Sequence, residues 1–315
     1  MSKLSPPALS YGPGHPHDTA VALGDLGGLT QFGVRLQRLL PGQASSMRHW
    51  HDREDEFVLI LEGTATLTED SGVTLLQAGD TAAFPAGRAN GHCLENRSDA
   101  VLRLLVAGWR DPQDICRYSG RDRQYRKSPD GDGYTRRDGQ SLHEDDDTGS
   151  YPDPHDHGPS GALDRANVPL KTGSIYPAPY GAMMAGRTSL RFGEAGGLTQ
   201  FGANLVMLDP GARSSLRHWH QHEDEFAYVT EGQLHLLEDG GDTKIQAGDC
   251  AAFPAGVANG HCFENRSSDP AAFLVIGSRA RVEFATYSDI DLTVALSAGT
   301  AVFTHKDGRP YVPPL

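Results

Sequence analysis

The sequence has no excess of positive charge and no long apolar run. It contains 28 Lys and Arg against 41 Asp and Glu, a formal net charge of −13. A surface this acidic repels phosphate backbones, so nucleic acid is not an expected partner. The longest apolar stretches, such as FLVIG at 273–277, are far shorter than the roughly 20 residues of a membrane helix. The first residues also lack the apolar segment of a signal peptide. We expect no membrane partner either.

Cysteine and helical periodicity are also scarce. Four cysteines in 315 residues do not suggest a disulfide scaffold, and we expect a cytoplasmic protein with reduced thiols. Cys93 and Cys262 are interpreted as inert, small apolar residues. No long amphipathic helix pattern is present, whereas 37 Gly and 20 Pro favour many tight turns. The composition therefore favours a β-rich protein.

The chain is an internal duplication. GGLTQFG, RHWH, EDEF, AAFPAG and ANGHC begin at residues 27, 48, 54, 82 and 89, and again at 196, 217, 223, 251 and 258. Every pair is 169 positions apart, as from residue 27 to residue 196. A period this long indicates a duplicated domain rather than a solenoid repeat.

This duplication sets the expected domain boundaries. We predict an N-terminal domain at 20–140, a Gly-, Pro- and Asp-rich linker at 141–165 and a C-terminal domain at 166–315. For the first 19 residues, a loose arm and a strand-swapped extension both remain open.

Short strands alternate with turns in each copy. The segments 61–67 and 230–237 are typical of two strands joined at a glycine, and 101–108 and 271–277 are typical of buried strands. Turn signals recur about every 8–12 residues, which favours an all-β antiparallel sandwich or barrel.

Each copy carries a set of metal-binding side chains. Residues His49 and His51 are spaced to point to one face of a strand, so both imidazoles can bind one ion. Glu56 follows after a polar turn, and His92 supplies a third imidazole from further along the chain. The second copy repeats the set as His218, His220, Glu225 and His261. We predict one divalent transition metal per domain, since three imidazoles and a carboxylate suit Fe, Mn, Ni, Cu or Zn.

These motifs resemble those of the cupin superfamily, and the two copies together resemble a bicupin. The first motif is Gly42…His49-Trp50-His51…Glu56…Gly63, and the second is Gly79…Pro85-x-Gly87…His92…Asn96, each repeated in the second copy. The resemblance implies two tandem jelly-roll barrels (double-stranded β-helices) that pack as an intramolecular pseudo-dimer. Association into a homo-oligomer is left open.

The spacing of the motifs departs from the family pattern in two places. Six residues rather than five precede His49, and four rather than two separate Gly87 from His92. We expect these insertions to reshape the rim of the pocket while leaving the ligands intact.

Three functions fit this resemblance. The first is a metal-dependent oxygenase of the dioxygenase type, acting on a small hydroxylated or carboxylate substrate. Because Glu56 and Glu225 are retained, the ligand set resembles that of quercetin-type dioxygenases more than that of gentisate-type dioxygenases. The second is a decarboxylase, isomerase or lyase. An oxalate decarboxylase is disfavoured because Ser46 and Ser215 stand where those enzymes have an arginine. The third is a non-catalytic binder of a small carboxylate or sugar.

Differences between the copies predict where the pockets diverge. Two positions on the Glu56 face become smaller in the second copy, which suggests a roomier C-terminal pocket: Val58 becomes Ala227, and Ile60 becomes Val229. Gln31 and Gln200 are candidate polar residues of the pockets. The histidine pairs at 15–17 and 155–157 lie in Pro-rich or acidic segments and are interpreted as surface residues, not metal sites.

Overall fold

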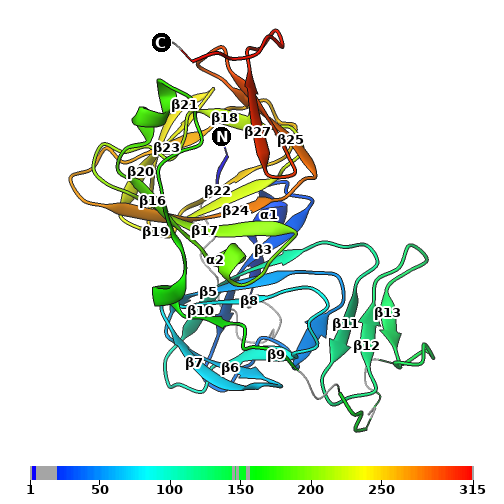
Figure 1. The fold of residues 1–315 in the computed structure, drawn as a ribbon. Helices are drawn as coiled ribbons and strands as arrows, with labels where there is room; N and C mark the ends of the chain where they lie inside the picture. Colours follow the sequence, from blue (N-terminus) through cyan, green and yellow to red (C-terminus); the bar gives the residue numbers. More distant parts are fainter. Residues whose placement is uncertain (1, 5–19, 144–145, 147–148, 154–156, 314–315) are drawn as a thin grey trace.

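The computed structural model describes residues 2–4, 20–143, 146, 149–153 and 157–313. This part of the chain is nearly all-β, and the two copies form two similar domains, as Figure 1 shows with the N-terminal domain in blue and cyan and the C-terminal domain in yellow and orange. Each domain pairs sheets face to face in the expected jelly-roll manner, without closing them into a continuous barrel. Among the described residues, no helix has the length and apolarity needed to cross a membrane.

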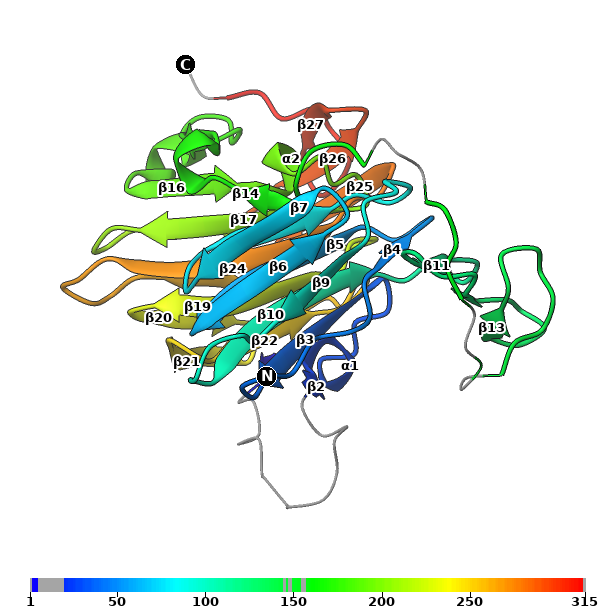
Figure 2. The ribbon, with the colours of Figure 1, turned by 90° about the horizontal axis from the view of Figure 1, so that it is seen from below.

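The N-terminal domain contains two sheets. The first has the strand order β14 (Ala162–Leu163), β8 (Thr81–Phe84), β5 (Glu56–Glu62), β10 (Leu102–Trp109), β3 (Phe32–Leu39) and β2 (Ala20–Ala22). The second has the order β13 (Gly133–Thr135), β12 (Gln124–Arg126), β11 (Ile115–Tyr118), β4 (His49–His51), β9 (His92–Glu95), β6 (Thr64–Glu69) and β7 (Gly72–Gln77). Strands β11 to β13 extend beyond the body of the domain (Figure 2).

The C-terminal domain repeats this arrangement. Its largest sheet has the order β1 (Lys3–Leu4), β22 (Cys250–Phe253), β19 (Glu225–Glu231), β24 (Ala271–Ser278), β17 (Phe201–Leu208), β16 (Arg187–Arg191) and β15 (Leu170–Thr172). The opposing layer has two parts: β21 (Gly241–Gln246), β20 (Gln233–Glu238) and β23 (Cys262–Glu264), then β18 (His218–His220), β25 (Val282–Tyr287), β26 (Thr293–Ser297) and β27 (Thr300–Thr304). A bridge between His218 and His261 joins the two parts.

Helices are short and lie at the edges of the sheets. Among the described residues they are α1 (Leu23–Leu26), α2 (Phe192–Ala195) and two 3-10 turns, η1 (Arg165–Asn167) and η2 (Tyr180–Met184). Helices α1 and α2 occupy equivalent positions before β3 and β17, and Leu23 and Phe192 from them are buried in the core between the domains.

Strand β5 is buried on both faces. Phe57 and Leu59 pack into the core between the domains. Val58 and Ile60 alternate with them and pack inside the N-terminal domain. Because side chains alternate along a strand, Glu56 shares the inner face with Val58 and Ile60. The β5–β6 turn requires Gly63, where φ is +82° and a Cβ atom would meet the Val101 carbonyl oxygen at 2.5 Å.

The two domains share one hydrophobic core. Buried side chains from both copies form a single cluster, in which the rings of Phe32 and Phe201 lie 6.0 Å apart and those of Phe57 and Phe192 lie 6.2 Å apart. Burial of each such side chain stabilises the fold by about 1.5–3 kcal/mol. The domains therefore pack as the intramolecular pair that the sequence predicts.

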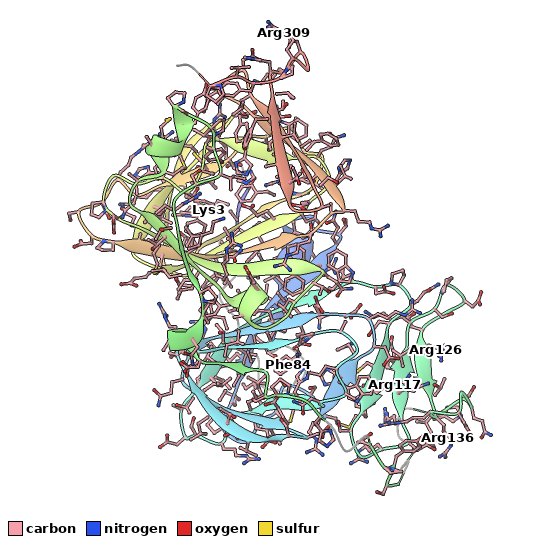
Figure 3. All side chains as sticks on the ribbon, viewed as in Figure 1. Lys3, Phe84, Arg117, Arg126, Arg136 and Arg309 are labelled. Carbon is pink, nitrogen blue, oxygen red and sulfur yellow. The ribbon has the colours of Figure 1, made fainter. Side chains whose placement is uncertain are left out.

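The domains also exchange short strands. Strand β1, from the N-terminal arm, pairs with β22 of the C-terminal domain, and Figure 3 shows Lys3 lying there. Strand β14, from the predicted linker, pairs with β8 of the N-terminal domain. The pairings are equivalent, since Lys3 lies opposite Ala251 and Ala162 lies opposite Ala82. Residues 3–4 are thus a strand-swapped extension, whereas 5–19, with the histidine pair at 15–17, lie outside the described residues.

Candidate metal centres

Two imidazoles of the N-terminal domain are held by bonds to their Nδ1 atoms. Strand β4 places His49 and His51 two residues apart on one face. His49 Nδ1 donates to the Met47 carbonyl at 2.9 Å, and His51 Nδ1 donates to Asp114 Oδ2 at 2.6 Å. Both Nε2 atoms therefore remain free to bind a ligand, which is the arrangement that metal-binding histidines use.

Glu56 and His92 come from other strands and meet the first histidine. Glu56 opens β5, and His92 opens β9 directly opposite His49. Ligand atoms of His49, Glu56 and His92 all lie within 4.8 Å of one another. His51 lies beside this group, with its ring centroid 5.1 Å from that of His49. The structure therefore brings together three of the predicted residues directly and places the fourth next to them.

His92 has an unusual environment. Its ring stacks on Phe84 at a centroid distance of 3.5 Å, and the residue is only 2% exposed. Neither of its ring nitrogens has a hydrogen-bond partner among the residues that the structure describes. A buried, unsatisfied polar atom is costly, so a ligand on Nε2 would remove this cost.

The C-terminal domain repeats the arrangement with closer contacts. His218 Nε2 lies 3.1 Å from His220 Nε2, which lies 3.6 Å from Glu225 Oε2. Glu225 Oε1 lies 3.3 Å from His261 Nε2. The His261 ring stacks on Phe253 at 3.6 Å, as His92 does on Phe84. All four predicted groups therefore converge in this domain.

The electrostatics of both sites favour a cation. Burial, reinforced by the neighbouring imidazoles, lowers the pKa of His49 to about 4 and that of His218 to about 3. Burial alone would raise the pKa of Glu56, but the surrounding histidines outweigh it and lower that pKa to about 2. Burial also disfavours the charged forms of His51 and His220, but neighbouring carboxylates outweigh it: Asp114 raises the pKa of His51, and Glu225 and Glu283 raise that of His220 to about 10. A divalent ion would displace the proton of such an imidazole, since metal binding requires neutral imidazoles and an ionised carboxylate. The donor set of each domain fits one such ion.

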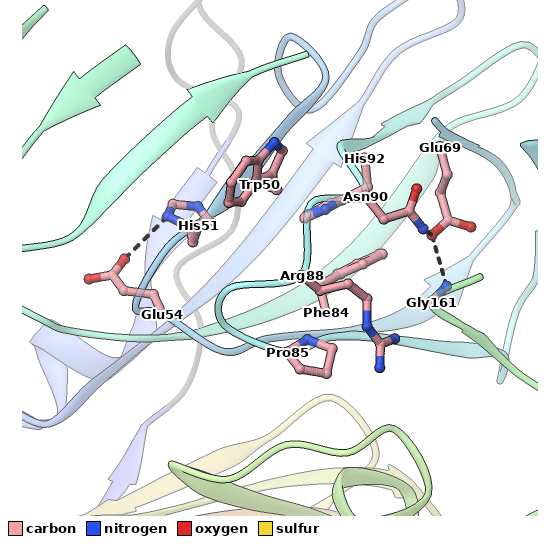
Figure 4. A pocket seen from close by; sticks show the side chains of 10 residues that line it. All are labelled: Trp50, His51, Glu54, Glu69, Phe84, Pro85, Arg88, Asn90, His92 and Gly161. Atoms are coloured by element: carbon pink, nitrogen blue, oxygen red, sulfur yellow. Dashed lines mark hydrogen bonds and ion pairs between the residues drawn. The ribbon is translucent and has the colours of Figure 1, made fainter. Parts of the chain in front are cut away.

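A cavity of about 660 Å³ opens onto the N-terminal site. Its lining includes all four candidate ligands, His49, His51, Glu56 and His92, together with Arg35, Glu54 and Lys127. Figure 4 shows Glu54 beside His51, where its Oε2 atom lies 3.7 Å from His51 Nδ1. Burial raises the pKa of Glu54, although Lys127 contacts its carboxylate. Val58 and Ile60 do not line this cavity, because both are fully buried in the core of the N-terminal domain. The smaller residues at the equivalent positions therefore give no reason to expect a roomier C-terminal pocket.

Sequence reasoning missed the carboxylates behind the ligands. Asp114 immediately precedes β11, whose pairing with β4 cannot be read from the sequence. In the second copy Glu283 takes its place, 3.4 Å from His220 Nδ1. Glu54 lies in the polar turn that the sequence predicts before Glu56. The sequence offered one indication of their role: Asp114 and Glu283 are both acidic and are 169 positions apart, as the repeated motifs are.

The prediction that Gln31 and Gln200 line the pockets is wrong. Gln200 Nε2 donates to the Arg53 carbonyl, and Gln31 Nε2 donates to the His222 carbonyl, both across the domain boundary. Their amides connect the domains because the loops before β3 and β17 face the partner domain. Of the second histidine pair outside the motifs, His155 lies outside the described residues, and His157 Nδ1 bonds the Ala89 carbonyl. Cys93 and Cys262 are buried, as expected.

The fold and the paired sites define a class: a tandem β-sandwich protein with a histidine- and carboxylate-lined centre in each domain. The cupin-domain family matches residues 35–108 and 204–277. The chain belongs to the cupin superfamily and is a bicupin.

Several solved structures are similar to this chain. A chain described as a sugar phosphate isomerase from a cupin superfamily, from Silicibacter pomeroyi DSS-3, is 54% identical; the match covers 48% of this chain and 96% of that one, with a TM-score of 0.47. A mutant oxalate decarboxylase of Bacillus subtilis is 18% identical over 84% of this chain and 73% of that one, with a TM-score of 0.50. The oxalate decarboxylase of Lactobacillus farciminis is 16% identical over 89% and 82%, with a TM-score of 0.49. A search of curated proteins finds no match.

Proposed function

We propose that this bicupin is a metal-dependent enzyme that acts on a small, anionic, oxygen-rich substrate in its N-terminal domain. The observation that carries the proposal is the cavity of about 660 Å³, which joins the candidate ligands to the cationic side chains of Arg35, Arg110 and Lys127. The Arg110 guanidinium bonds Asp25 and the Leu29 carbonyl, so the substrate-binding role is assigned to the other two. The proposed ligands of one divalent ion per domain are His49, His51, Glu56 and His92, and His218, His220, Glu225 and His261. When bound, the ion would polarise a substrate oxygen.

The cations select the charge of the substrate. Arg35 and Lys127 line the cavity beside the candidate metal ligands, where a carboxylate or phosphate group would be held by charge-assisted hydrogen bonds. At the equivalent positions of the C-terminal domain stand Asn204 and Leu296. We assign catalysis to the N-terminal domain and a structural role to the C-terminal metal.

Proton transfer is the reaction class that the cavity supports best. Glu54 is only 7% exposed, and burial raises its pKa, which favours a carboxyl group that can hold a proton. Its carboxylate is held by the Asp111 backbone N–H and by Lys127. In this proposal Glu54 moves a proton to or from the substrate, as an isomerisation or a decarboxylation requires.

An oxygenase is the second candidate. The three imidazoles and one carboxylate of each set would also suit a redox-active ion such as Fe, Mn or Cu, which would supply oxygen chemistry. The two candidates make opposite predictions about oxygen.

Anaerobic and aerobic incubations separate them. Protein loaded with Mn(II) or Fe(II) is incubated with sugar phosphates, oxalate, hydroxy acids, catechols and flavonols, and products are identified by NMR and mass spectrometry. We expect turnover of an anionic substrate without oxygen. Turnover only in air would establish the oxygenase. Ligand-induced stabilisation with no product from any compound would instead establish a binding protein and overturn the proposal.

Variants test the assignment of the cavity. Removal of either cation, in Arg35→Ala or Lys127→Ala, should raise KM for the anionic substrate about 10- to 100-fold, because a hydrogen bond to a charged group contributes about 1.5–3 kcal/mol. Asn204→Ala, at the equivalent position of the other domain, is the control and should leave KM unchanged. Equal effects of Arg35→Ala and Asn204→Ala would contradict the placement of the active site.

A further inference from the structure

The two candidate metal sites differ by one sulfur atom. Strand β11 pairs antiparallel with β4, and Cys116 lies directly opposite His51. Strand β25 pairs with β18 in the same register, and there Ala285 lies opposite His220. Directly opposite residues project to the same face of a sheet, so Cys116 shares the face of the two imidazoles. The C-terminal copy presents only a methyl group there.

The distances place this sulfur within reach of the site. Cys116 Sγ and one ring nitrogen of each of His49 and His51 all lie within 4.8 Å of one another. Donors on one tetrahedral zinc ion lie about 3.5 Å apart, given bonds of about 2.1 Å to nitrogen and 2.3 Å to sulfur. Side-chain shifts of up to about 1 Å therefore suffice for all three atoms to bind one ion. His49 also belongs to the group with Glu56 and His92, which connects the two sets.

The site shows an independent need for a ligand. His92 is buried, and its Nε2 atom has no hydrogen-bond partner among the described residues. Cys116 is half-buried, and two of the buried cysteines have different surroundings: Cys93 Sγ lies 3.8 Å from Glu95 Oε1, and Cys250 Sγ lies 3.5 Å from the Leu4 carbonyl oxygen. Within the described part of the chain, Cys116 is the cysteine that joins a candidate metal cluster.

We propose that Cys116 is an additional, sulfur ligand of the N-terminal metal, so that this site takes thiophilic divalent ions such as Zn(II), Co(II) or Cd(II) more tightly than the C-terminal site. The proposal rests on the metal sites of the proposed function. Soft thiolate ligands favour such ions, whereas the imidazole and carboxylate set alone does not distinguish them. On binding, the thiol proton leaves to solvent as the sulfur–metal bond forms.

Cobalt substitution tests the sulfur contact directly. The full chain is loaded with Co(II), bound cobalt is counted by elemental analysis, and the near-ultraviolet spectrum is searched for sulfur-to-cobalt charge transfer. We expect two cobalt ions per chain and a charge-transfer band, which Cys116→Ala loses while it still binds two ions. Cys116→Ala introduces the residue found at position 285, and Cys116→Ser is a second variant that keeps the side-chain size.

Competition with a chelator gives a second readout. We expect the Zn(II) affinity of the N-terminal site to fall by about tenfold or more in Cys116→Ala, since even the loss of a residue behind a ligand typically costs 10- to 100-fold. Two bound cobalt ions without a charge-transfer band, or a band that persists in Cys116→Ala, would overturn the sulfur ligand and leave the proposed function intact. Absence of any bound cobalt would overturn both.

Discussion

The carboxylate of Asp55 in the N-terminal domain accepts hydrogen bonds from the backbone N–H groups of Thr199 and Gln200 in the C-terminal domain, at 2.6 and 2.8 Å. Asp224 makes the reciprocal bonds to Thr30 and Gln31, at 2.7 and 2.9 Å. Both aspartates are almost completely buried, and each immediately precedes a candidate metal ligand. The domain interface therefore fixes the chain at the point where Glu56 and Glu225 enter the sites.

This arrangement predicts a large loss of stability for Asp55→Ala. The substitution leaves three backbone donors without their acceptor, since Asp55 Oδ1 also accepts from the Ala86 N–H. We expect the free energy of unfolding to fall by about 3 kcal/mol or more, measured by denaturant unfolding. Asp99→Asn, at an exposed position, should change it by less than about 0.5 kcal/mol. Similar small changes in both variants would show that the interface does not depend on this carboxylate.

The bond from His51 to Asp114 predicts a loss of metal affinity in Asp114→Asn. The carboxylate orients the imidazole and increases its basicity, so its removal should weaken metal binding at the N-terminal site about 10- to 100-fold. Chelator competition followed by elemental analysis measures this. Asp114→Glu introduces the residue that the other copy has at position 283 and should retain most of the affinity. Equal losses in both variants would contradict an orienting role.

Metal binding itself should stabilise the fold. An ion that binds only the native state adds about 2.7 kcal/mol when its free concentration is 100 times Kd. We expect treatment with a chelator to lower the Tm, and added Mn(II) or Zn(II) to restore it. A double variant, His92→Gln with His261→Gln, should show neither effect. A Tm that responds to metal equally in this variant would place the binding elsewhere.

The metal-free protein should lose stability toward acid pH. Burial lowers the pKa of His49 to about 4. Its contribution to the free energy of unfolding is therefore complete above 6.5, the pKa of histidine in the unfolded chain, and is lost as the pH falls through 4. His49→Gln should remove on the order of 3 kcal/mol of this acid-side loss. The pKa of His220 is raised to about 10 by Glu225 and Glu283, against the effect of burial. Its contribution is present below 6.5 and is lost as pH rises through 10, so His220→Gln should flatten the alkaline side.

Unfolding of metal-free protein across pH 4 to 10 measures both slopes. Parallel curves for wild-type protein and both variants would contradict the two histidine environments. If both variants flattened the same side of the pH–stability curve, the opposite pKa shifts of His49 and His220 would be contradicted.

The sequence predicted the all-β tandem fold from its turn signals and its internal repeat. The residues alone placed His218 and His220 on one face of a strand, whereas it was the resemblance of the motifs to those of the cupin superfamily that implied a fold bringing Glu225 and His261 to them. What escaped prediction depends on strand register. Neither Asp114 nor Cys116 could be placed, because β11 pairs with β4 across more than sixty residues and nothing local specifies that register.

Predictions from single side chains failed for a related reason. Gln31 and Gln200 are polar and near the strands of the site, yet they bond across the domain boundary. Val58 and Ile60 do share a face with Glu56, but the jelly roll is filled at their level, so their size affects the core and not the cavity. The alternation of side chains along a strand predicts which face a residue lies on, but not whether that part of the face lines the cavity or the core.

X-ray diffraction from crystals of metal-loaded protein, with anomalous data collected at the absorption edge of the metal, would locate each ion and its ligands. We expect one anomalous peak in each domain. Each ion should lie about 2.0–2.3 Å from three imidazole nitrogens and one carboxylate oxygen of the two predicted sets. Crystals that hold metal elsewhere, or that leave both histidine clusters without a peak at saturating metal, would contradict the proposed metal sites.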